Sequence, residues 1–168
     1  SGIGFVLAGR ALTLKLFSTT AANIAGIFFL IIPAFAGNAF LMTPDTLLAL
    51  CWALTVYSAW KAMESDSPLG WWVVTGLIAG LGLLSKYNMI LFFAGLGVFW
   101  LSQKDCRRRI FVGAFTSGIV ALCVFAPVII WNAQHDWLSF RFQLAHGFAD
   151  ESPPFYLTLL EYTGGLLL

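Results

Sequence analysis

Residues 69–101 read LGWWVVTGLIAGLGLLSKYNMILFFAGLGVFWL, and this stretch decides the fold class of the chain. Lys86 is the one charge in it. The hydrocarbon core of a bilayer is ~30 Å thick and takes ~20 apolar residues to cross as a helix. The stretch is therefore too long for one ordinary span and barely long enough for two. We predict two short membrane helices that meet at a turn around Lys86.

The rest of the chain has the same character. Its 168 residues are 60% hydrophobic and 10% charged, whereas soluble domains are about 25% charged. Because an open sheet would leave backbone groups unpaired in lipid, each span should be helical. We predict an all-α, polytopic transmembrane helical bundle, one domain over 1–168, incomplete at both ends because it begins and stops inside apolar runs. The predicted spans lie near 1–15, 18–41, 46–62, 69–85, 87–102, 110–131 and 155–168.

Two further patterns concern packing and partners. Small residues at Ala22/Gly26 and Gly76/Gly80 have the i, i+4 spacing that lets helix backbones approach closely. The formal net charge of +1 gives no reason to expect nucleic acid as a partner, whereas membrane lipids are expected. The three cysteines are far apart, without metal-ligand spacing, and are predicted to be small, buried apolar residues: Cys51, Cys106 and Cys123.

The basic residues predict the orientation of the bundle. Seven of the nine Lys and Arg residues fall on one face when the spans alternate, and the positive-inside rule makes that face cytoplasmic. They are Arg10, Lys15, Lys61, Lys104, Arg107, Arg108 and Arg109. The opposite face then carries residues 42–45, residues 85–88 and a long outer loop, 132–154.

Lys86 and Asp45 are the first candidates for function. A charge near hydrocarbon costs ~2.5–3.5 kcal/mol at the centre of a membrane helix and usually has a partner. Lys86 either anchors an anionic group such as a phosphate or extends from a helix end to the interface without any ligand. Asp45 either stabilises the start of a helix, in the sequence Thr43-Pro44-Asp45, or faces a cavity and orients a hydroxyl, a metal or a cation.

The outer loop supplies a second group of candidates. Polar side chains between Trp131 and Trp137 suit sugar and phosphate ligands, but an aromatic belt with a polar turn would also account for them. Aromatic and Leu residues from Trp137 to Phe148 recur every three or four positions, which predicts a short amphipathic helix in the interface. The candidate substrate-binding residues are Asn132, Gln134, His135, Asp136 and Arg141. His135 and His146 lack metal-ligand spacing, and Asp150-Glu151 is read as a solvated pair.

Three sequence blocks together resemble a known family. They are LMTPDTLL at 41–48, GLLSKY at 82–87 and PVIIWNAQHDW at 127–137. In order and approximate spacing they are similar to the bacterial membrane glycosyltransferases related to protein O-mannosyltransferases and to the aminoarabinose transferase that acts on lipid A. The resemblance extends over essentially the whole chain.

The resemblance implies a multi-helix lipid-linked-sugar glycosyltransferase in the bacterial inner membrane. Its donor would be a polyprenyl-phosphate sugar, used at the periplasmic face, with a lipid, protein or glycan as acceptor. Lys86 would lie near the donor phosphate, Asp45 would act at the start of its helix, and residues 132–136 would line the same cavity. A divalent metal is compatible with such a site, although no metal ligand is assigned. The family's main carboxylate lies in a loop that would precede this chain.

Two other functions are open on sequence alone. A transporter or flippase could pair Lys86 with Asp45 along a substrate path, because broken helices and buried charges suit that class too. Repeat symmetry would be expected of a transporter, and none is visible. The polar groups could also serve assembly only.

Overall fold

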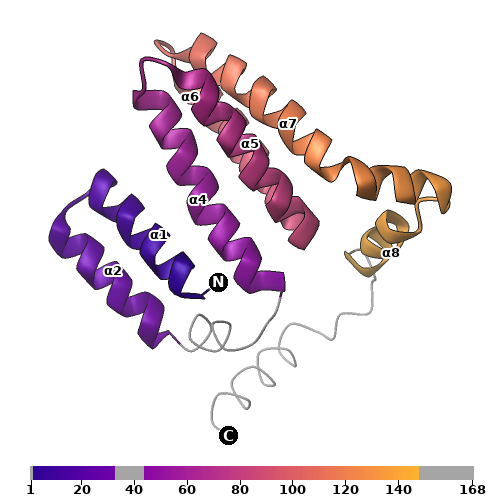
Figure 1. Ribbon diagram of the computed structural model, residues 1–168, viewed down its shortest axis with the longest axis horizontal. Helices are drawn as coiled ribbons and strands as arrows, with labels where there is room; N and C mark the ends of the chain where they lie inside the picture. Colours follow the sequence, from indigo (N-terminus) through magenta and orange to yellow (C-terminus); the bar gives the residue numbers. More distant parts are fainter. Residues whose placement is uncertain (1, 33–43, 148–168) are drawn as a thin grey trace, which may run out of the picture. The chain divides into compact units, whose positions relative to one another are not determined.

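The computed structural model describes residues 2–32 and 44–147, and every regular element among them is helical (Figure 1). This confirms the predicted all-α fold class. Three of the described helices, α4, α5 and α7, are long and apolar enough to cross a membrane. The elements are α1 (Gly2–Leu16), α2 (Thr19–Ile31), α4 (Pro44–Glu64), α5 (Pro68–Ser85), the 3₁₀ helix η1 (Tyr87–Met89), α6 (Ile90–Ser102), α7 (Arg107–Gln134) and α8 (Leu138–Gly147).

The described helices begin and end close to the predicted boundaries, while the crossing of the membrane by each of them stays a prediction. The predicted break at Lys86 is confirmed, because α5 ends at Ser85 and a 3₁₀ turn leads into α6. The predicted span 110–131 is longer, since α7 begins at Arg107 and continues to Gln134. A helix, α8, is present where the short amphipathic helix was predicted, and its position in the interface stays a prediction. Span 155–168 lies outside the described residues, and span 18–41 is described only as far as Ile32.

The chain divides into two compact units, residues 1–127 and 128–168, and each is described by itself. In the first unit, α4 and α5 form a helical hairpin whose polar contact lies in its middle. Thr75 Oγ1 is 2.9 Å from Ser58 Oγ, and the Ser58 hydroxyl donates to the carbonyl of Thr55 at 3.0 Å. All three residues are buried. A hydrogen bond between helices in an apolar setting stabilises the pair.

Glycines bring α5 and α7 into close contact. A Cβ built on Gly76 would lie 2.6 Å from the backbone oxygen of Ser117, and one built on Gly80 would lie 2.6 Å from Cβ of Val124. The predicted small-residue seam is therefore confirmed for this pair. The absence of a Cβ lets the two backbones approach more closely than larger residues allow.

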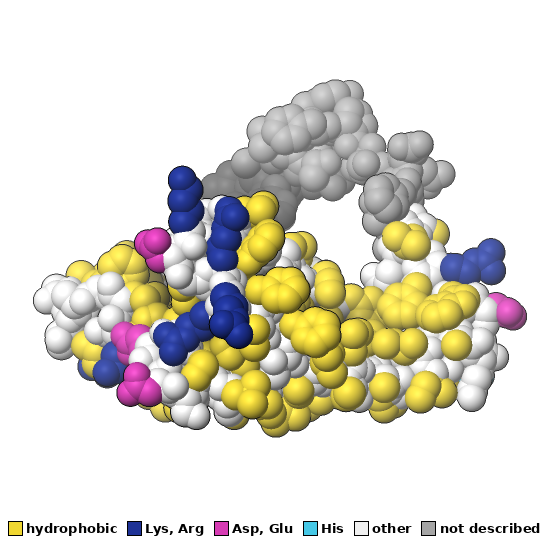
Figure 2. Space-filling model, turned by 90° about the horizontal axis from the view of Figure 1, so that it is seen from above, with side chains coloured by type: hydrophobic (Ala, Val, Ile, Leu, Met, Phe, Trp, Pro, Cys, Tyr) yellow, Lys and Arg dark blue, Asp and Glu magenta, His cyan; other side chains and the backbone are white. Residues whose placement is uncertain are grey.

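The basic residues gather where α4 ends and α7 begins. Arg109 donates to the carbonyl oxygens of Met63 at 2.8 Å and Ser65 at 2.6 Å, which are at the C-terminal, electronegative end of α4. Figure 2 shows Lys and Arg side chains gathered beside acidic ones on this part of the first unit. Arg10 instead lies inside α1 and donates to Oδ1 of Asn23 in α2 at 2.9 and 3.2 Å.

Replacing Gly76 with alanine tests the seam. The new methyl group would meet backbone atoms of α7, which cannot move aside as a flexible side chain can. Overpacking of this kind costs about 1–3 kcal/mol, so we expect a clearly lower midpoint of thermal unfolding for the full-length protein in detergent. Gly70→Ala, on the same helix with nothing within 4 Å of the added atom, is the control. Equal effects of the two substitutions would contradict the seam.

Candidate functional site

The turn at Lys86 begins the candidate site. Lys86 is the residue that ends α5, and its backbone is extended, with φ −156° and ψ 134°. Its amide still donates to the carbonyl of Gly82 at 2.9 Å, and its carbonyl accepts from Met89 at 3.2 Å. The backbone is thus paired on both sides of the break, as a membrane chain requires. The lysine side chain is left free to leave the helix axis.

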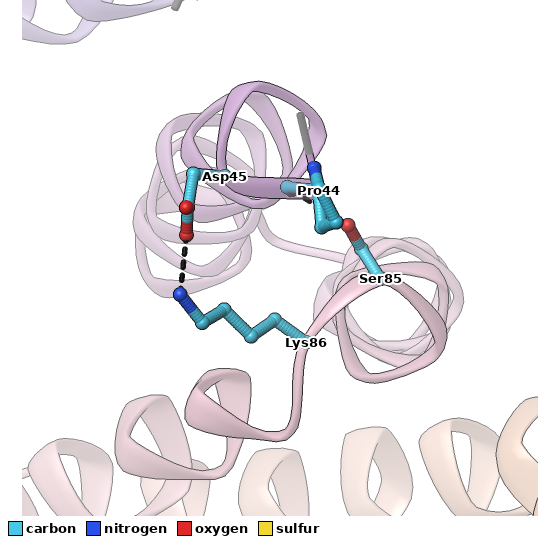
Figure 3. A network of polar contacts seen from close by, with 4 residues as sticks. All are labelled: Pro44, Asp45, Ser85 and Lys86. Atoms are coloured by element: carbon cyan, nitrogen blue, oxygen red, sulfur yellow. Dashed lines mark hydrogen bonds and ion pairs between the residues drawn. The ribbon is translucent and has the colours of Figure 1, made fainter. Parts of the chain in front are cut away.

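Asp45 meets this lysine from the start of α4. Its Oδ1 lies 2.6 Å from Nζ of Lys86, although the two residues are 41 positions apart. Beside them, the hydroxyl of Ser85 donates to the carbonyl of Pro44 at 2.8 Å. Figure 3 shows the Asp45–Lys86 contact, with Ser85 beside Pro44, where the first turn of α4 meets the end of α5. Two of the three sequence blocks therefore converge at one end of the hairpin.

The ion pair is accessible. The side chains of Lys86 and Asp45 are 44% and 49% exposed, and an exposed pair contributes only about 0–1 kcal/mol to stability. An ammonium carries three N–H donors, of which one meets Asp45. Within the described residues the other two have no acceptor, so Lys86 can bind an incoming anion without releasing its carboxylate.

Asn132, in the second unit, is fully buried. Its amide nitrogen donates to the carbonyl of Val128 at 2.9 Å, and its side-chain oxygen accepts from the backbone N–H of Ser139 in the first turn of α8 at 3.1 Å. Its own carbonyl accepts from Trp137 at 2.8 Å. Asn132 therefore joins the end of α7 to the start of α8. Its predicted role in binding substrate stays a prediction.

The other candidates in the second unit are exposed. The ring of His135 stacks on Trp131 with centroids 4.2 Å apart, and its Nδ1 lies 2.7 Å from the carbonyl of Trp131. Asp136 has a φ of 52° and the next residue, Trp137, a φ of 57°, a conformation that aspartate adopts more readily than a bulky residue. The side chains of Gln134, Asp136 and Arg141 have no hydrogen bond or ion pair with described residues.

A family comparison can now be set beside this geometry. The model of the dolichyl-phosphate-mannose-protein mannosyltransferase family matches residues 10–131, more than half of the chain, and the match includes Asp45 and Lys86. The chain belongs to this family. It is accordingly a membrane glycosyltransferase of the class that uses a lipid-linked sugar donor. Neither a curated protein nor a solved structure matches the chain.

Within this mannosyltransferase family member, the sequence pattern located Asp45 and Lys86 but did not show that they touch. Ser85 was not among the predicted site residues, although it is adjacent to Lys86. In the described ranges, no three His, Cys, Asp or Glu side chains come together as a metal site requires, so no step below is assigned to a metal. Asp150, Glu151 and the side chain of His146 lie outside what the structure describes.

The role of Asn132 in this family member can be tested through α8. In Asn132→Ala the amide of Ser139 loses its acceptor, and a lost buried hydrogen bond costs about 1–3 kcal/mol. We expect faster hydrogen–deuterium exchange over the first turns of α8, read peptide by peptide in the full-length protein. The exposed neighbour Gln134, replaced by alanine, is the control. Unchanged exchange in the Asn132 variant would show that its amide does not organise this turn.

Proposed function

We propose that the protein transfers a glycosyl group from a polyprenyl-phosphate sugar to a hydroxyl of a lipid, protein or glycan acceptor, at the outer face of a bacterial inner membrane. The observation that carries this proposal is the accessible Asp45–Lys86 pair at 2.6 Å. It lies at helix ends, in a chain whose family uses lipid-linked sugars. Such a position suits a phosphate that stays at the membrane surface.

The chemistry assigns Lys86 to the leaving group. The acceptor oxygen bonds to the anomeric carbon, the bond from that carbon to the phosphate oxygen breaks, and the phosphate departs with the electron pair. A carboxylate takes the proton of the acceptor. The ammonium of Lys86 stabilises the charge that develops on the phosphate. Asp45, the predicted catalytic residue, holds that ammonium and orients the acceptor.

An apolar cavity supports the isoprenoid character of the donor. A cavity of about 470 Å³ lies between α1, α4, α5 and α6, and its lining includes Trp52, Trp72, Leu91, Phe92 and Gly95. Leu91 follows Lys86 by little more than one helical turn. Apolar and aromatic walls bind a hydrocarbon chain without unpaired polar groups. We propose that part of the polyprenyl chain occupies this cavity while the phosphate meets Lys86.

The distribution of basic residues supports a position of the Asp45–Lys86 pair at the outer face of the membrane. Lys61 and Arg109 are at the far end of the α4–α5 hairpin from Lys86, and membrane proteins keep Lys/Arg-rich segments in the cytoplasm. The Asp45–Lys86 pair then faces outward. In the second unit, Gln134, His135, Asp136 and Arg141 stay predicted substrate-binding residues, since they are exposed and carry the polar groups that sugars and phosphates bind.

Substitutions of Lys86 and Asp45 should distinguish the roles of the two residues. In the full-length enzyme, Lys86→Ala should lower kcat/KM by about 10²-fold, as loss of one preorganised charge-stabilising donor does, and should weaken the binding of polyprenyl phosphate. Asp45→Asn should also lower kcat. It should leave phosphate binding equal or tighter, because the competing negative charge is gone. Release of the sugar and binding of polyprenyl phosphate are the two measurements.

Lys86→Arg is the matched variant, since it keeps the positive charge and should retain part of the activity. If Lys86→Ala leaves both binding and turnover unchanged, the assignment of Lys86 is wrong. A transporter would move the donor across the membrane and leave the sugar attached to it. Recovery of intact donor would therefore favour a transporter over a glycosyltransferase.

The cavity can be tested with two glycines of α6. A Cβ on Gly95 or on Gly97 meets nothing within 4 Å, but only Gly95 lines the cavity. Gly95→Leu should raise KM for a long-chain donor several-fold, because the side chain takes the volume of the isoprenoid. A short-chain donor should be affected much less. Gly97→Leu should leave both unchanged, and a similar effect of the two variants would remove the cavity from the proposal.

A further inference from the structure

A second cavity lies at the basic end of the first unit, away from the Asp45–Lys86 pair. It has a volume of about 460 Å³ and lies between the start of α5, the loop before α7 and the start of α7. One part of its lining is apolar and is supplied by Leu69, Trp72 and Val112. The other part is charged and is supplied by Asp105, Arg108 and Arg109. This combination suits an amphipathic occupant.

The charged residues differ in their availability. Arg109 is engaged by the carbonyls of Met63 and Ser65. Arg108 and Asp105 are exposed, and no ion pair joins them to each other or to another residue in the described ranges. Two opposite charges thus line one cavity without neutralising one another. Arg108 also belongs to the first turn of α7, where the helix dipole favours an anion.

Trp72 belongs to the apolar part of the lining. It is 1% exposed, and its indole N–H has no hydrogen-bond partner among the described residues. An indole N–H is a donor only, and a buried donor without an acceptor costs free energy. Because that N–H is itself shielded from the cavity, Trp72 contributes only to the apolar part of the lining.

From these observations we infer that this cavity is a binding site for a phosphatidylethanolamine-type phospholipid. The guanidinium of Arg108 pairs with the phosphate, and the carboxylate of Asp105 accepts hydrogen bonds from the primary ammonium of the headgroup. Leu69, Trp72 and Val112 contact the upper part of an acyl chain. The inference does not rest on the proposed donor site, although Trp72 lines both cavities.

Headgroup selectivity distinguishes this site from general attraction to anionic lipid. Phosphatidylcholine carries the same charges but its quaternary ammonium has no N–H to donate, whereas phosphatidylglycerol has no positive charge for Asp105. We expect the full-length protein to bind dioleoyl phosphatidylethanolamine roughly fivefold to tenfold more tightly than the matched phosphatidylcholine, the range of one hydrogen bond of ordinary net strength. Native mass spectrometry with each lipid titrated from mixed micelles measures this.

Substitutions of Asp105 and Arg108 test the role of each charge in lipid binding. Asp105→Asn should remove most of the preference for ethanolamine over choline while keeping the affinity for phosphatidylcholine. Arg108→Ala should weaken both lipids by a similar factor. Lys104→Ala removes a neighbouring exposed charge that does not line the cavity, and should change neither.

Three results would overturn the inference. They are tighter binding of phosphatidylglycerol than of phosphatidylethanolamine by the unaltered protein, equal binding of the ethanolamine and choline lipids, or a loss in Lys104→Ala as large as in Arg108→Ala. The first two comparisons need no variant, so a substitution that disturbs folding cannot leave the question open.

Discussion

The constraint on which this structure depends is that a helix end in or near hydrocarbon must find partners for its backbone groups. The described helices meet it with side chains from their neighbours. Arg109 of α7 supplies donors to the carbonyls at the end of α4, and Asn132 supplies an acceptor to the start of α8. At the other end of the hairpin, Ser85 donates to Pro44. Charged and polar groups are concentrated at helix ends for this reason.

Sequence reasoning predicted the helices because their cause is local. A single lysine in a long apolar run predicts a break, and the break is at Lys86. The glycine spacing at Gly76 and Gly80 predicted a close helix contact but not its partner, which proved to be α7. The start of α7 was predicted three residues late, because the predicted span began after the charged residues Arg107, Arg108 and Arg109. Arg109 is held in α7 by its hydrogen bonds to carbonyl oxygens at the end of α4. These contacts join residues far apart in the sequence, so no local pattern could predict them.

The candidate site was predicted in part for the same reason. Asp45 and Lys86 were selected as individual residues, since charge at a membrane helix end calls for an explanation. Their contact depends on how α4 and α5 pair, which no local pattern contains. Asn132 shows the converse case. An amide among polar residues resembles a ligand group in sequence, yet its burial and its bonds to Val128 and Ser139 could be seen only once α8 was placed.

The Asp45–Lys86 pair is not needed to hold the hairpin together, and this argues for its functional use. The buried contact between Thr75 and Ser58 already joins α4 to α5 in mid-helix, and the seam with α7 fixes the other side of α5. A half-exposed pair adds little to stability, whereas holding a cation near hydrocarbon is costly. A pair of small structural value at an accessible end is free to rearrange around an anion. The proposed role of Lys86 in binding a phosphate therefore does not conflict with the stability of the hairpin.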